Sequence, residues 1–194
     1  FSLLFVFETA SMYFIAVGIA LLFNLFYPSE SKNALDKYRN KLDSTIKEHL
    51  IYLKEKIESQ EITCDFSHEL EMKIEEILDS INQITGDMIM KNHQDILRYS
   101  VMRNKQFDIL KNICFQSDKL HSIYPQTSIV ISYLESLSNN IGVTDYATNK
   151  LEEIDLLLEG FKEEKLPVSR DEFEHRAVLY YIILEIRQFL LLKI

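Results

Sequence analysis

The first residues of this chain are its most apolar stretch. Thr9 to Tyr27 contain no charged residue, and Asn24 is the only strongly polar one among them. About 19 helical residues at ~1.5 Å each cover roughly 28 Å, which matches the ~30 Å hydrocarbon core of a bilayer. We therefore expect residues 1–28 to form a transmembrane helix that ends near Pro28.

Two alternatives to a membrane span remain open for this stretch. A secretory signal has a basic start, a short apolar core and a small-residue cleavage site, whereas here no Lys or Arg precedes the run and it ends in Phe26-Tyr27-Pro28. The other alternative is a buried helix of a soluble protein. Because the first residue is Phe rather than Met, we expect the chain to begin within a longer protein.

The charges after Pro28 indicate what the rest of the chain faces. The sequence has 21 Lys and Arg against 30 Asp and Glu, and the net charge of -9 argues against a nucleic-acid partner, because phosphate binding needs a basic face. Several basic residues lie within about 20 residues of the span, which marks its cytoplasmic end. They are Lys32, Lys37, Arg39, Lys41 and Lys47. We expect a protein of the cell membrane with residues 29–194 on the cytoplasmic side.

The two cysteines, Cys64 and Cys114, are far apart in the sequence and form no C-x-x-C motif. In a cytoplasmic domain they should be reduced, and small buried hydrophobic side chains are their simplest role.

The remaining residues predict helices and no sheet. Glycine and proline are scarce, with four and three in 194 residues. Apolar residues recur at steps of three and four, and no long segment alternates with period two. The prediction is an all-α chain, with one transmembrane helix followed by an elongated antiparallel bundle of five or six helices over 29–194. The expected bundle helices cover approximately residues 29–59, 67–88, 96–123, 127–140, 145–162 and 169–192.

The last helix has the clearest predicted start. Ser169 can cap it, and Glu172 can complete a capping box, while Val168 and Phe173 are placed for a hydrophobic staple. From Ala177 onward the helix is apolar all round for about two turns, which is typical of a helix buried on all sides. We therefore expect it at the centre of the bundle or in an oligomer interface.

No motif in the sequence predicts catalysis. G-x-G-x-x-G, G-x-x-x-x-G-K-[ST], G-x-S-x-G and H-E-x-x-H are all absent. Glu172 and His175 form the only Glu-x-x-His pair, and Asp65/His68 and Asp118/His121 repeat its spacing with aspartate. Such pairs arise readily by chance in an acidic chain, so we predict no enzyme, no metal and no cofactor.

Two polar residues in the apolar stretch are weak candidates for a substrate pathway. An acid beside a span is costly to bury and hints at an ion pair or a pathway, so Glu8 has either that role or a place at the outer interface in water. Asn24 can hydrogen-bond to another span or lie at the cytoplasmic interface.

A basic cluster is the third weak candidate. Arg98, Arg103 and Lys105 lie beside Tyr99 and Phe107. Charge and ring contacts of this kind can bind an organic anion. A solvated helix face is the alternative.

Three segments together resemble a known bacterial family. Ala16–Pro28, AVGIALLFNLFYP, resembles the end of the last span in the aromatic acid exporter family of the fusaric-acid-resistance-like transporters. Met102–Leu110, MRNKQFDIL, is similar to the M-R-x-K-Q-F-x-x-L stretch of its C-terminal domain. Leu166–Ala177, LPVSRDEFEHRA, looks like L-P-x-T-R-E-E-F-E-N-R-A in that domain and is the most specific match. The resemblance covers almost the whole chain.

The resemblance implies an order of parts. In this family several membrane spans precede a cytoplasmic all-helical domain, so this chain is expected to start in the last span and to contain the whole C-terminal domain. It departs from the pattern in two places: His175 stands where Asn is usual, and Glu8-Thr9 stand where a basic residue is often found.

The functional expectation is the C-terminal cytoplasmic domain of a membrane exporter of small aromatic organic acids, which assembles or gates the membrane domain. Its expected partners are membrane lipid, the upstream spans of the same protein and further copies of the chain. The alternative is a membrane-tethered helical protein-interaction domain without transport activity.

Overall fold

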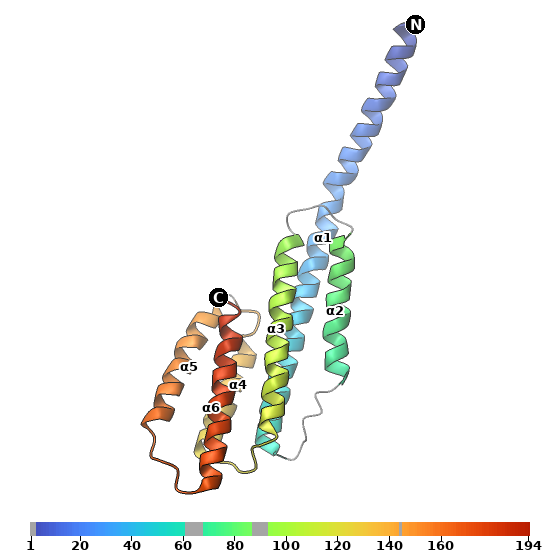
Figure 1. The fold of residues 1–194 in the computed structure, drawn as a ribbon. Helices are drawn as coiled ribbons and strands as arrows, with labels where there is room; N and C mark the ends of the chain where they lie inside the picture. The colour runs from blue at the N-terminus through green and yellow to red at the C-terminus, as the bar shows by residue number, and fades with distance from the viewer. Residues whose placement is uncertain (1–2, 61–67, 87–92, 144) are drawn as a thin grey trace. The chain divides into compact units, whose positions relative to one another are not determined.

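The computed structural model describes residues 3–60, 68–86, 93–143 and 145–194, and the side chains among them except those of residues 3–5, 24–35, 68–70, 84–86 and 93. The described residues form helices and no strands, as the sequence predicts (Figure 1). The helices are α1 (Leu3–Ser59), α2 (His68–Gly86), α3 (His93–Ser117), α4 (Pro125–Asn140), α5 (Tyr146–Glu163) and α6 (Arg170–Leu191). The chain divides into two compact units, 1–38 and 39–194.

The first unit contains the apolar part of α1. Val6–Phe23 has a mean hydropathy of 1.9, and none of these residues is buried within the chain. In the described residues this is the one helix long and apolar enough to cross a membrane. A helix whose apolar side chains all point outward needs another apolar medium around it.

The helix does not stop at Pro28, where we expected the end of the span. α1 continues without a break to Ser59. Proline removes one backbone hydrogen bond and crowds the preceding turn, at a cost of about 3 kcal/mol. The long helical runs on both sides of Pro28 each add a hydrogen bond per residue, which offsets this local cost.

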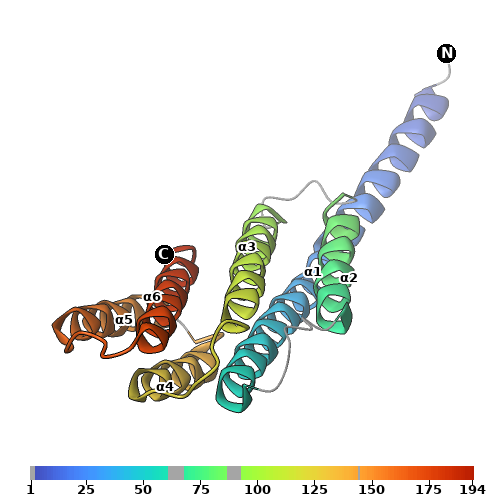
Figure 2. The ribbon, with the colours of Figure 1, turned by 60° about the horizontal axis from the view of Figure 1, so that its bottom comes forward.

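The second unit is a helical bundle with one continuous core. The spacing of three and four predicts an apolar stripe within residues 29–59, and its members Leu42, Ile46, Leu53 and Ile57 on α1 are all buried. The α2 stripe is confirmed over its described side chains, which are Ile74, Ile77 and Ile81; Leu70, Ile84 and Met88 lie outside the described side chains. α2 packs against α3, and α6 packs against α3, α4 and α5 (Figure 2).

The contacts of the last helix agree with a place at the centre of the bundle, although within this chain it is not buried on all sides. Tyr181 and Leu184 remain 38% and 41% exposed. α6 has neighbours on three sides only, so one face stays open to solvent.

Two boundaries differ from the prediction for clear local reasons. α3 ends at Ser117, whose hydroxyl donates to the Cys114 carbonyl at 2.6 Å, and a turn follows. Pro125 does not stop that helix but begins α4, because proline suits the first helical position, where no N–H bond is needed. The Thr127 hydroxyl accepts from the Tyr124 N–H at 3.1 Å and fixes this start.

The turn between α4 and α5 depends on a glycine. Gly142 has φ +87°, a left-handed conformation that other residues rarely adopt, directly after the helix end at Asn140. The asparagines and the glycine of the sequence Asn139-Asn140-Ile141-Gly142 suit such a turn. The turn lies against α1, because a Cβ on Gly142 would be 3.5 Å from Asp43 Oδ2.

Cys114 differs from the expectation of a reduced thiol. It is fully buried in the core and disulfide-bonded. The other cysteine of the sequence, Cys64, lies outside the described residues.

The start of α6 confirms the capping box but not the staple. The Glu172 N–H donates to Ser169 Oγ at 3.0 Å, and Glu172 Oε2 accepts from the Val168 N–H at 2.8 Å. Val168 and Phe173, by contrast, both point into solvent, at 95% and 61% exposure. The loop is therefore held by polar contacts, which leave its apolar side chains free.

This difference gives a stability prediction. Ser169→Ala should lower the free energy of unfolding by about 1 kcal/mol, because it removes the cap from the Glu172 N–H. Val168→Ala should change it by less than about 0.5 kcal/mol, because the side chain packs on nothing. Urea denaturation in detergent, followed by circular dichroism, measures both. An equal loss in the two variants would contradict the absence of a staple.

Candidate functional site

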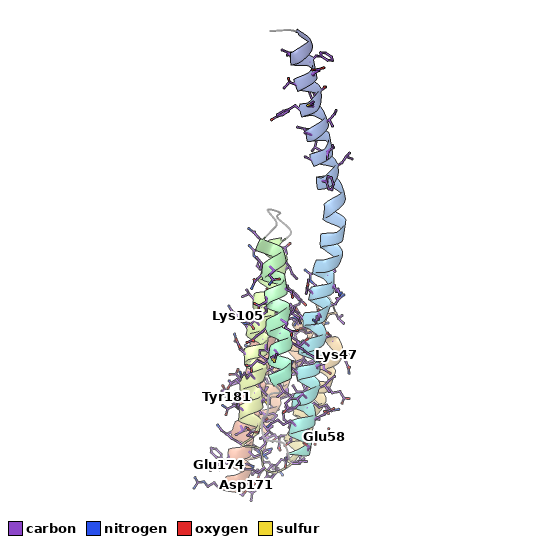
Figure 3. All side chains as sticks on the ribbon, turned by 90° about the vertical axis from the view of Figure 1, so that its right-hand side faces the viewer. Lys47, Glu58, Lys105, Asp171, Glu174 and Tyr181 are labelled. Atoms are coloured by element: carbon purple, nitrogen blue, oxygen red, sulfur yellow. The ribbon has the colours of Figure 1, made fainter. Side chains whose placement is uncertain are left out.

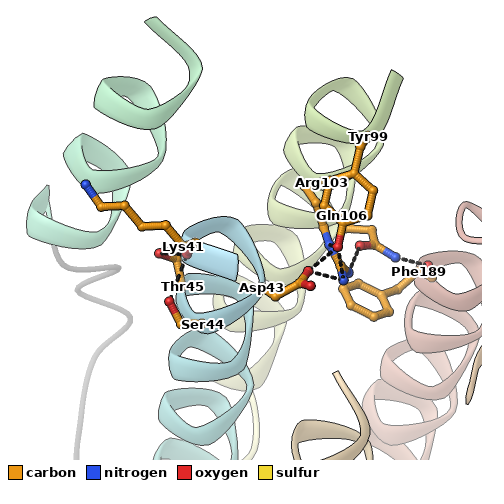
Figure 4. Close-up of polar contacts among 8 residues, drawn as sticks. All are labelled: Lys41, Asp43, Ser44, Thr45, Tyr99, Arg103, Gln106 and Phe189. Carbon is orange, nitrogen blue, oxygen red and sulfur yellow. Dashed lines mark hydrogen bonds and ion pairs between the residues drawn. The ribbon is translucent and has the colours of Figure 1, made fainter. Parts of the chain in front are cut away.

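The most concentrated polar cluster in the bundle surrounds Arg103. Its guanidinium is fully buried, although Asn104 and Lys105 follow it in the sequence. Burial of an unpaired charge would cost several kcal/mol, so the side chain needs partners in every direction. α1 and α3 supply the hydrogen-bond partners, and α6 joins the network through one of them (Figure 4).

The carboxylate of Asp43 on α1 is the counter-ion. Arg103 Nη2 and the Tyr99 hydroxyl both donate to Asp43 Oδ1. Arg103 also donates to the Tyr99 oxygen, from Nη2 at 3.0 Å and from Nε at 3.2 Å. The Asp43 side chain is 13% exposed, so this ion pair is almost completely shielded from water.

Gln106 extends the network to α6. Arg103 Nη1 donates to Gln106 Oε1 at 2.6 Å, and Gln106 Nε2 donates to the Phe189 carbonyl at 2.8 Å. That carbonyl belongs to the last turn of α6. The chain of contacts therefore joins α1 to α6 through two adjacent turns of α3.

Three cations surround the ring of Tyr99. Arg39, Arg103 and Lys193 lie 5.0, 5.1 and 5.1 Å from its centroid. Burial, and then repulsion from Arg103, lower the pKa of Lys193. Burial would lower the pKa of Arg103, but its neighbours Tyr99, Tyr146 and Asp43 raise it above its ordinary value. Burial also raises the pKa of the Tyr99 phenol, which therefore stays protonated and donates to Asp43.

The predicted basic cluster does not converge on one point. Arg103 points into the core, whereas Arg98 and Lys105 are exposed on another face of α3. Those two residues line a shallow depression of about 380 Å³ together with Leu97, Val101, Met102 and Leu192. Anion binding there stays a prediction. The spacing of Arg103 could have distinguished it from the exposed Arg98 and Lys105. It belongs to a 4-3-4 pattern that is typical of a buried stripe, which consists of Tyr99, Arg103, Gln106 and Leu110.

The other candidates are placed apart from this cluster. Glu8 is exposed on the apolar helix of the first unit, and Asn24 belongs to α1, but its side chain lies outside the described residues. Their proposed roles in a pathway stay predictions.

The Glu172-x-x-His175 pair is engaged in structural contacts. Glu172 Oε1 accepts from Arg176 Nη2 at 2.6 Å, and His175 Nε2 lies 2.8 Å from Thr127 Oγ1. Asp118, of the similarly spaced pair, accepts from Lys56. The pair Asp65 and His68 lies outside the described side chains.

The fold thus defines an all-helical domain that follows a membrane-length helix on the same chain, and comparison with known proteins agrees. Residues 32–194 match the family described as "Putative aromatic acid exporter C-terminal domain". The chain belongs to this family, and the resemblance read from its sequence is confirmed.

One sequence relative and one solved structure extend the comparison. The Bacillus subtilis strain 168 protein named "Uncharacterized protein YqjA" is 26% identical over 203 residues, which cover 97% of this chain and 59% of that protein. The chain thus spans less than two thirds of this relative. A solved chain titled "Crystal structure of putative membrane protein from Clostridium difficile 630" has a TM-score of 0.73 at 23% identity, covering 82% of this chain and 96% of that one, and supports the helical fold.

The Arg103 network gives a second stability prediction. Asp43→Asn should lower the free energy of unfolding by about 3 kcal/mol, because it leaves a buried guanidinium without its counter-ion. The double variant Asp43→Asn/Arg103→Met should lose less than the sum of the single variants. Lys73→Met is the matched control: its ion pair with Glu48 is exposed on both sides and is worth less than about 1 kcal/mol. Equal losses in Asp43→Asn and Lys73→Met, by urea denaturation, would contradict the prediction.

A third prediction concerns pH. Burial lowers the pKa of His175 below its usual value near 6.5. Because its pKa is lower in the folded protein, His175 binds a proton more readily in the unfolded chain. Its contribution to stability is therefore complete above about pH 6.5 and is lost as the pH falls from there through the pKa of the folded protein. His175→Asn should therefore reduce the drop in Tm between pH 7.5 and 5.5. Burial lowers the pKa of His49 as well, but His49 is present in both proteins and cancels in the comparison. The same drop in both proteins would exclude this role of His175.

Proposed function

We propose that this chain is the C-terminal part of a membrane exporter of small aromatic organic acids, with residues 29–194 in the cytoplasm assembling or gating the membrane domain. The observation that carries the proposal is an adjacency on one helix. Val6–Phe23 is long and apolar enough to span a bilayer, and the family match begins at residue 32, further along the same α1.

In this function the transport pathway is formed by membrane spans outside this chain. Alternating access needs at least two bundles or repeats that move around a substrate site, and one helix cannot supply them. The bundle then has the role of a cytoplasmic part that holds subunits together or controls the inner mouth of the pathway. The Arg103 network supports a rigid body of this kind, because it joins helices far apart in the sequence.

The cytoplasmic side is supported by the basic residues that follow the span. Lys37, Lys41 and Lys47 have no ion pair among the described residues, so their charge is available to bias the orientation of the helix. The disulfide at Cys114 argues against a cytoplasmic location, because disulfides are typical of oxidising compartments.

Thiol labelling decides the orientation. In the full protein with Cys64 and Cys114 replaced by Ser, Lys41→Cys should react with a membrane-impermeant maleimide only after the cells are permeabilised. Glu8→Cys, before the apolar run, should react in intact cells. The reverse pattern would place the bundle outside the cytoplasm and contradict the proposal.

Deletion tests the role in transport. Removing residues 29–194 from the full protein should abolish export of aromatic acids or dissociate the subunits, measured by efflux from loaded cells and by crosslinking of the membrane domain. Unchanged export together with an unchanged oligomeric state would contradict the proposal. It would leave the alternative of a tethered interaction domain, whose mark is a stable complex with a soluble cytoplasmic protein.

A further inference from the structure

One outer surface of the bundle exposes hydrophobic side chains from two helices. α6 exposes Tyr181, Leu184 and Leu191, and α3 exposes Val101 and Phe115, each between 37% and 54%. We call these five residues the α3–α6 face. Isolated exposed hydrophobic residues are normal on a protein surface, but several of them on two packed helices can mark an interaction site.

The five residues form one surface because α3 and α6 pack side by side. Asn112 Nδ2 of α3 donates to the Tyr181 hydroxyl of α6 at 2.8 Å, which joins the middle of the face. At one end, Val101 and Leu192 line the same depression. In Figure 3 Tyr181 and Lys105 lie along the same side of the bundle. The 14 residues from Val101 to Phe115 give the face a length of about 21 Å.

Two opposite charges lie between Val101 and Phe115, while Arg98 beside Val101 and Glu185 beside Tyr181 lie at the border of the face. Lys105 and Asp108 are both exposed on α3 between Val101 and Phe115, one helical turn apart. Neither forms an ion pair with another described residue, although most described cations of the bundle do. A surface that exposes a cation one turn from a carboxylate is complementary to itself: when two copies meet, each of these charges can face its opposite.

The size of the face fits a contact that needs help from the membrane. Two helices about 10 Å apart and about 21 Å long present roughly 400 Å² per copy, or about 800 Å² in total, which is below the ~1,000 Å² of stable specific interfaces and in the range of weak contacts. Confinement of both copies to one membrane raises their effective concentration and makes such a contact sufficient.

We propose that the α3–α6 face binds the same face of a second copy of this chain, with Lys105 of each copy opposite the partner's Asp108. This inference rests on the proposed function, because the contact is a structural form of its assembling role. The apolar residues on both sides of this pair are then removed from water.

A charge swap tests the pairing. Donor- and acceptor-labelled chains, reconstituted in phosphatidylcholine vesicles, should show energy transfer that depends on protein density. Lys105→Glu and Asp108→Lys should each weaken dimerisation about tenfold, because like charges then meet across the contact. The double variant should return to within about threefold of the wild type, since the pair is restored with opposite sign. Lys41→Glu, an exposed cation on α1, is the matched control and should match the wild type.

A second pair of variants tests the apolar surface. Leu184→Arg on α6 should abolish the energy transfer, whereas Leu156→Arg, on the exposed side of α5, should leave it unchanged. All these positions are exposed, so urea midpoints close to the wild-type value should show that the variants fold.

Three results would overturn the proposal: no energy transfer at any density, transfer that survives Leu184→Arg, or a double variant as weak as the single ones. The second result would place the contact elsewhere, for example in the apolar helix. The energy-transfer assay involves no transport. A negative result in it therefore does not contradict the export proposal, and a negative result in the export assay does not contradict the dimer contact.

Discussion

The bundle depends on keeping one guanidinium satisfied away from water. Arg103 is fully buried, its hydrogen-bond partners lie on α1 and α3, and one of them, Gln106, extends the network to α6. Each partner is itself oriented by this contact: Asp43 by two donors, Tyr99 by the carboxylate it donates to, and Gln106 by the Phe189 carbonyl. A polar network of this kind stabilises little by its charge alone, since desolvation offsets most of the gain. It does fix which turn of α3 meets α1 and α6, because any shift along the helices leaves a buried group unpaired.

Helix positions and apolar stripes could be predicted because they depend on local spacing. Leu42, Ile46 and Ile74 lie where the periodicity predicts them. The role of Pro125 could not be predicted in the same way, because proline ends one helix and begins the next with equal ease, and the turn before it decides. For the Arg103 network, the sequence indicated a basic residue beside an aromatic one but not their arrangement in space. Whether a basic residue on α3 faces solvent or the core depends on Asp43, which is 60 residues away in the sequence.

The segment that resembles the family most closely serves the fold in this structure. In Leu166–Ala177 the polar side chains tie the α5–α6 loop together, with Ser169 and Glu172 capping α6 and Arg176 donating to the Lys165 carbonyl at 2.7 Å. The open apolar side chains of the same segment, Val168 and Phe173, have no such role within the chain. A motif of this kind identifies the family through the way its last helix begins, and says little about the transported molecule.

The central position of α6 has a consequence for how the protein is made. α6 is the last helix of the chain, and α3, α4 and α5 all pack on it. During synthesis at ~5–20 residues per second, these three helices leave the ribosome before their common partner exists. Their apolar faces stay open for that interval. The core is therefore completed only after α6 is made, and a chain interrupted before Arg170 lacks the helix on which α3, α4 and α5 pack.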